Sequence, residues 1–102
     1  MWRSGDVTLA TDPVEAPVVR LHPLDNVVVA TGRIVGGTLT AREGLRALQP
    51  IPMGHKMATL GIAAGEPILK YGQVIGAATT DIAVGSHVHS HNMAMSEKRR
   101  DA

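Results

Sequence analysis

Hydrophobic residues in this chain form short runs that are separated by glycine, proline and polar turn residues. Two β-branched runs, at 18–21 and 26–31, lie on either side of a His-Pro-Leu-Asp segment, which is the pattern of strands joined by a tight connection. From residue 51 onward glycines interrupt the apolar segments at positions 54, 61, 65, 72, 76 and 85, and the pieces between them are too short for ordinary helices. The pattern predicts a mostly β fold, a compact domain of short strands with Gly-rich turns.

The segment 38–48 fits two local structures. Thr40 and Glu43 have the spacing of a helix capping box, whereas Arg42, Glu43 and Gly44 suit the turn of a β-hairpin. We favour the hairpin.

A short internal echo indicates two similar turns. Four positions carry the same or a similar residue twenty positions later. The first set is Ile62, Ala63, Gly65 and Ile68, and the second is Ile82, Ala83, Gly85 and Val88. A solenoid normally needs three or more repeats, so we expect two related turns, each leading into a strand, within one barrel-like body.

The two ends of the chain lack the pattern of short hydrophobic runs separated by turn residues. Residues 1–17 are polar, contain two prolines and show no sustained period, and residues 94–102 include the basic run Lys98, Arg99 and Arg100. We predict a flexible leader at 1–17, one folded domain at 18–93 and a flexible tail at 94–102.

Composition restricts the chemistry. The 102 residues include one Trp, one Tyr and no Phe, which predicts an aliphatic core and provides no aromatic platform for stacking nucleic-acid bases. Cysteine is absent, which excludes disulfides, a thiolate nucleophile and Cys-ligated metals within this chain. Any metal ligands must be imidazole, carboxylate, carbonyl or water.

The charge balance disfavours several classes of partner. The formal net charge is +1 and the basic residues are scattered, so we expect no binding to nucleic acid or membranes. No apolar run approaches the roughly 20 residues of a membrane span, and the first residues do not have the pattern of a signal peptide. The expected location is the cytoplasm.

The sharpest candidate site is a run of alternating histidines, His87, His89 and His91. In an extended strand these side chains project from one face and form an edge suited to a metal ion. The Cα atoms of the outer two would lie about 13 Å apart, so a full set of ligands requires a bend, a distant residue such as His22 or His55, or another subunit. Such Cys-free sites suit Fe(II), Mn(II) or Zn(II). The alternative is a polar strand face whose histidines contact water.

Two other segments place a lysine within two positions of a glycine. In Gly54-His55-Lys56 the imidazole and the ammonium could hold an anion, or the segment could be a surface turn with two solvated side chains. Lys70 precedes Tyr71, which could take part in a site with it or could fill the core.

Near the start of the folded part, Asp25 and Asn26 suit a turn, and His22 with Asp25 could orient a ligand. The sequence contains no P-loop, dinucleotide glycine fingerprint or GxSxG elbow, which disfavours nucleotide and serine-hydrolase chemistry.

Four segments, LHPLDNVVVA, IPMGHKMATLGIAAGE, ILKYGQVIGAAT and DIAVGSHVHSHN, occur in this order between residues 21 and 92. Together they closely resemble the amino-terminal domain of the altronate dehydratase family, which is related to galactarate dehydratase and to the small subunit of sulfolactate sulfo-lyase. The resemblance implies an SAF domain with a β-clip fold. It also implies lyase chemistry on a hydroxy acid, with iron as the usual metal of the dehydratases.

The motif positions of that family carry over to particular residues here. We expect catalytic roles for His55, Lys56, Lys70 and Tyr71, substrate contacts from His22, Asp25, Asn26 and Asn92, and metal ligands in His87, His89 and His91, with Fe(II) as the first candidate ion. Among these residues His55, His87 and His89 are the leading candidates.

The family's long catalytic region does not follow these motifs in the sequence. The resemblance therefore implies a small accessory subunit of a sugar-acid dehydratase, a hydro-lyase, that is inactive alone and works with a separate large catalytic subunit on an acidic, sugar-derived substrate. The alternatives are the small subunit of sulfolactate sulfo-lyase and a noncatalytic carbohydrate-binding or assembly module. Self-association into a homo-oligomer stays open.

Overall fold

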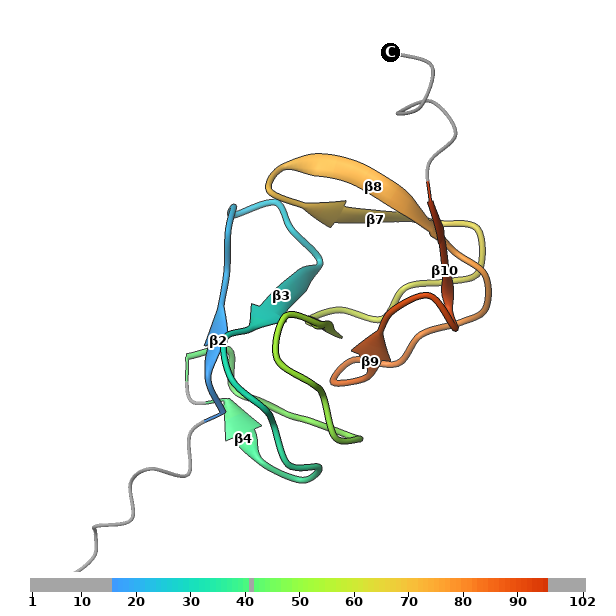
Figure 1. Ribbon diagram of the computed structural model, residues 1–102. Helices are drawn as coiled ribbons and strands as arrows, with labels where there is room; N and C mark the ends of the chain where they lie inside the picture. Colours follow the sequence, from blue (N-terminus) through green and yellow to red (C-terminus); the bar gives the residue numbers. More distant parts are fainter. Residues whose placement is uncertain (1–15, 41, 96–102) are drawn as a thin grey trace, which may run out of the picture.

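The computed structural model describes residues 16–40 and 42–95, which form short antiparallel strands and no helix. The strands are β2 (Val18–Val19), β3 (Val27–Ala30), β4 (Leu39–Thr40), β5 (Leu45–Arg46), β6 (Lys56–Ala58), β7 (Pro67–Lys70), β8 (Gln73–Ala78), β9 (His87–Val88) and β10 (Met93–Met95). The prediction of a mostly β fold with Gly-rich turns is confirmed (Figure 1). Within these residues there is accordingly no helix that could cross a membrane.

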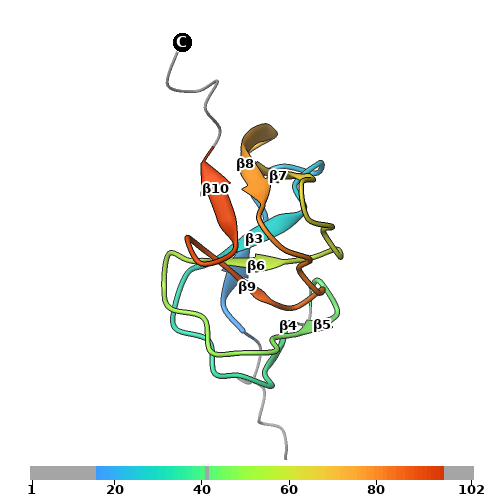
Figure 2. The same cartoon turned by 90° about the vertical axis from the view of Figure 1, so that its right-hand side faces the viewer.

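The strands form one four-stranded sheet in the order β2-β3-β6-β9, a three-stranded sheet in the order β10-β8-β7 and the β4-β5 hairpin. In both views the β7–β8 hairpin lies above the four-stranded sheet (Figures 1 and 2). Strand β6 lies between β3 and β9, and its residue Met57 pairs with His87. This register places the segment around His55 beside β9.

The predicted hairpin at 38–48 is confirmed by the pairing of β4 with β5. The buried Thr40 hydroxyl donates to the carbonyl of Leu45 and accepts the Leu45 N–H, so it closes the hairpin and caps no helix. Glu43 instead pairs with Arg20 at 2.8 Å.

Isoleucines and glycines at a fixed spacing build four similar turns. Ile34 bridges Ile51, Ile62 bridges Ile82, and each pair exchanges two backbone hydrogen bonds. The glycine three positions after each isoleucine has a positive φ between 86° and 90°, a value that the third position of a type II turn requires. These glycines are Gly37, Gly54, Gly65 and Gly85. The internal repeat at 62–88 thus contains the second of two bridged isoleucine pairs. The sequence analysis did not identify the first pair, Ile34 and Ile51.

The core consists of two aliphatic clusters. Ile34, Ile51 and Met57 belong to one, and Ile68 and Val88 belong to the other. No aromatic residue is buried among the described residues, which agrees with the predicted core.

Residues on both sides of the predicted range 18–93 form backbone hydrogen bonds with the strands. The Ala16 N–H donates to the carbonyl of Leu39, and the Pro17 carbonyl accepts the Thr31 N–H. At the other end β10 extends to Met95 because residues 94 and 95 pair with β8. The remainder of the predicted leader and tail, 1–15 and 96–102, lies outside the described residues.

Candidate metal centre

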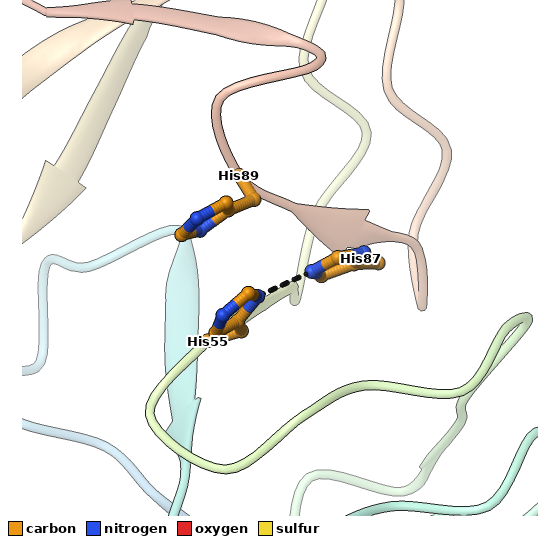
Figure 3. Close-up of side chains that lie close together, drawn as sticks. All are labelled: His55, His87 and His89. Carbon is orange, nitrogen blue, oxygen red and sulfur yellow. Dashed lines mark hydrogen bonds between the residues drawn. The ribbon is translucent and has the colours of Figure 1, made fainter.

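Three histidines converge between β6 and β9 (Figure 3). His55 lies in the turn before β6, His87 begins β9, and His89 follows the end of β9. One ring nitrogen from each lies within 4.8 Å of the other two. These are the three residues that the sequence favoured first, and the distant histidine that the alternating run required is His55.

The spacing of two of these nitrogens is close to that of metal ligands. Nδ1 of His55 lies 2.8 Å from Nε2 of His87, a hydrogen bond in which one ring is the donor. Two nitrogens bound about 2.1 Å from one ion would lie roughly 3.0–3.4 Å apart. A divalent ion could therefore replace the shared proton with little backbone movement.

The third histidine has an unused ring nitrogen. Nδ1 of His89 is buried and has no hydrogen-bond partner in the described part of the chain, a state that is uncommon for a buried polar atom. Its ring is stacked on His55, with centroids 3.8 Å apart, so it must rotate to direct a nitrogen at an ion shared with the other two. Three imidazoles and no thiolate fit Fe(II), Mn(II) or Zn(II).

The protonation states of His87 and His89 also suit a metal. Burial, followed by the nearby His91, lowers the pKa of His87 below its ordinary value of 6.5. Burial, followed by the nearby His55, lowers the pKa of His89 in the same direction. Neutral rings, which can act as ligands, are thus favoured at neutral pH.

His91, expected as a metal ligand, lies at the edge of this group. Its ring centroid is 5.0 Å from that of His87, the two rings are tilted by 40°, and the side chain is exposed. It does not belong to the converging set. The reason is that β9 ends at Val88, so the strict alternation of an extended strand does not continue to position 91.

Asn92 holds the turn that carries His89. Its amide nitrogen donates to the carbonyl of His87, and its amide oxygen accepts the N–H of His89, both at 2.9 Å. On the other side, the His87 N–H donates to the side-chain oxygen of Gln49. Gln49 was missed by the sequence analysis because nothing distinguishes it from an ordinary loop residue.

Lys56 is the first residue of β6, directly after His55, and is only 8% exposed. Burial, followed by the nearby Lys70, lowers the pKa of Lys56 below its ordinary value. No carboxylate among the described residues forms an ion pair with it. The interpretation of this segment as a turn with two solvated side chains is therefore wrong for Lys56.

The remaining candidate residues gather elsewhere, at the turn between β7 and β8. The buried Asp25 carboxylate accepts the N–H groups of Tyr71 and Gly72, each at 2.8 Å. Tyr71 is 68% exposed, so its interpretation as a core residue is wrong. His22 and Lys70 line a pocket together with Tyr71.

Asn26 ties this region to β7. Its amide nitrogen donates to the carbonyl of Pro67 at 3.0 Å, and its amide oxygen accepts the N–H of Leu69 at 2.8 Å. The structure therefore gives Asn26 two backbone partners on β7.

Comparison with known proteins finds one matching family and several relatives. The altronate/galactarate dehydratase SAF domain matches residues 16–96. The chain is 42% identical over 76 residues to altronate dehydratase of Escherichia coli, an alignment that covers 72% of this chain and 15% of the relative. It is 36% identical over 95 residues to galactarate dehydratase (L-threo-forming) of Escherichia coli, covering 91% of this chain and 18% of the relative.

A further relative is much shorter. The chain is 39% identical over 83 residues to (2R)-sulfolactate sulfo-lyase subunit alpha of Chromohalobacter salexigens, covering 72% of this chain and 88% of the relative. The chain thus spans about 15–18% of the length of the dehydratases and most of the length of this subunit.

Proposed function

Since this chain belongs to the altronate/galactarate dehydratase SAF domain family, we propose that it is the small accessory subunit of a lyase that acts on a sugar-derived hydroxy acid. Its part in the reaction is to supply a metal site, and a separate large subunit completes the catalytic centre. The observation that carries the proposal is the convergence of His55, His87 and His89.

The subunit arrangement has support from the relatives. A domain of this kind is about 15% of a longer dehydratase chain in one relative and makes up most of a named subunit in another. The same domain can therefore serve as part of a long chain or as a separate chain. We propose the separate form here, located in the cytoplasm, whose reducing conditions suit Fe(II) and a chain without cysteine.

Fe(II) is the proposed ion, and His55, His87 and His89 are its proposed ligands. A divalent ion at this place would polarise the carboxylate or the leaving hydroxyl of a hydroxy acid. The three imidazoles are neutral ligands, so anionic oxygens of a substrate or water would complete the coordination. The ammonium of Lys56, a residue that is only 8% exposed, would hold an anionic oxygen beside them, because the described residues give it no carboxylate partner.

A sulfonated hydroxy acid is the second candidate substrate. The alignment covers 88% of the Chromohalobacter salexigens sulfo-lyase subunit at 39% identity, and identity to altronate dehydratase of Escherichia coli is 42% over 76 residues. A second sulfo-lyase subunit alpha, from Paracoccus pantotrophus, is 46% identical over 48 residues, so identity does not separate the two candidate substrates. The two candidates differ in the group that leaves, which is hydroxide for a dehydratase and sulfite for a sulfo-lyase.

The test is anaerobic co-purification with the candidate large subunit, followed by Fe(II)-dependent assays on altronate, galactarate and (2R)-sulfolactate. We expect turnover of one substrate only when both chains are present, and loss of turnover in His89→Ala but not in His91→Ala. Full activity of the large chain alone, together with failure of the two chains to associate, would contradict the proposal and favour a noncatalytic carbohydrate-binding or assembly module.

A further inference from the structure

His91 is the histidine of the alternating run that stays outside the converging set, and it lies directly beside that set. Its ring centroid is 5.0 Å from that of His87, and its side chain is exposed. The other three histidines are half-buried, and Nδ1 of His89 is fully buried. An exposed imidazole therefore lies next to a less accessible group of three.

A tight turn holds His91 in this place. The N–H of Asn92 donates to the carbonyl of His89 at 3.1 Å, which makes 89–92 a four-residue turn with His91 at its third position. The Asn92 side chain also accepts the N–H of His89 and donates to the carbonyl of His87. The backbone that carries His91 is thus tied to the end of β9, so the fold itself keeps His91 near His87.

The three converging histidines are poorly placed to meet an ion that arrives from solution. Nδ1 of His55 and Nε2 of His87 are bonded to each other, and the His89 ring must rotate before it can bind an ion shared with them. A single exposed imidazole needs no such change to replace one water of a hydrated ion. An ion bound there would be held at a high effective concentration beside His87.

We propose that His91 is the entry ligand of the metal site: it binds an incoming divalent ion first and transfers it to His87, 5.0 Å away between ring centroids. Each step exchanges one ligand for another, because water leaves the ion when His91 binds, and His91 leaves when His55 and His89 complete the set. His91 therefore changes the rate of loading and not the final affinity. The inference rests on the proposed function, which supplies the three-histidine site.

The experiment is stopped-flow mixing of the metal-free chain with Co(II), followed by the visible absorption of the protein-bound ion, with an equilibrium titration under the same conditions. Co(II) is the probe because it accepts imidazole ligands as Fe(II) does and is stable in air. We expect equal Kd values in the wild type and His91→Ala but an association rate constant about tenfold lower in the variant. Since Kd is the ratio of the two rate constants, the dissociation rate constant should fall by the same factor.

Two control variants separate this role from general effects. Ser90→Ala changes an exposed neighbour in the same turn, and His22→Ala removes an imidazole that lines a different pocket. Both should leave the two rate constants unchanged. His91→Ala should fold as the wild type does, because the side chain that it removes is exposed.

Equal association rate constants in the wild type and His91→Ala would overturn the inference. A loss of equilibrium affinity in His91→Ala would also overturn it, because His91 would then be a permanent ligand. A second ion bound by the wild type but not by His91→Ala would do the same, because His91 would then belong to a separate site.

These three outcomes leave the three-histidine site and the proposed function intact. Absence of Co(II) binding in the wild type, or equal affinity in the wild type and His89→Ala, would instead remove the site together with the role of His91.

Discussion

Nδ1 of His55 lies 2.8 Å from Nε2 of His87, although 32 positions separate the two residues. The contact results from sheet register, because β6 follows His55 directly and pairs with β9 through Met57 and His87. A strand edge with two nearby histidines becomes a three-histidine site only through this pairing.

The lowered pKa values of His87 and His89 predict that the metal-free protein loses stability in acid. The unfolded chain, with ordinary values near 6.5, takes up protons first as the pH falls. The contribution of these groups is therefore complete above about pH 6.5 and is lost as the pH falls through the lowered folded values. Thermal unfolding with a chelator should show a falling midpoint, and the double variant His87→Gln, His89→Gln should show a flatter profile. An equal fall of the unfolding midpoint with pH in the wild type and the double variant would contradict the prediction.

Asp25→Asn should destabilise the protein by about 1–3 kcal/mol, because Tyr71 and Gly72 donate to different oxygens of the buried carboxylate and the amide NH2 would replace one of these acceptors with a donor. Asp81→Asn is the matched control. Its carboxylate also accepts a backbone N–H, from Ala64, but it is exposed, so the cost should stay below about 1 kcal/mol. Denaturant unfolding measures both changes, and equal costs would refute the role given to Asp25.

Two glycine substitutions should differ in cost because they act by different mechanisms. A Cβ at Gly76 would overlap the carbonyl oxygen of Ala94 on the neighbouring strand, so Gly76→Ala should cost about 3 kcal/mol. Gly65 has open space around the Cβ position but a φ of 90°, so Gly65→Ala should cost about 1 kcal/mol. The free energies of unfolding of both variants test this order, and the reverse order would contradict the packing described for β10.

Asn92→Ala should weaken Fe(II) binding about 10–100-fold, because the amide nitrogen and the amide oxygen of Asn92 hold the backbone of His87 and His89. Asn26→Ala is the control, since Asn26 also bonds two backbone groups but does so at β7. It should leave Fe(II) affinity unchanged even if stability falls. Equal affinity in Asn92→Ala and wild type would remove the positioning role of Asn92.

Local patterns in the sequence predict much of the fold. The β-branched runs, the hairpin at 38–48 and the short glycine-bounded strands depend on neighbouring residues, and the structure confirms them. The first Ile–Gly pair was missed because the residues around Ile34 and Ile51 differ more than those around Ile62 and Ile82.

The candidate site depends on contacts that local patterns do not contain. The need for a distant histidine followed from strand geometry, but the choice between His22 and His55 depends on the register of β6 with β9. His91 was included because the alternation continues in the sequence beyond the residue where β9 ends. The positive φ of Tyr71 was also missed, since an aromatic residue is unusual at that turn position.

Fe(II) binding by the purified chain tests the three-histidine site most directly. Anaerobic equilibrium dialysis should find one ion per chain in the wild type and in His91→Ala, and a large loss of affinity in each of His55→Ala, His87→Ala and His89→Ala. Absence of saturable binding in the wild type, or equal affinity in the wild type and His89→Ala, would contradict the account.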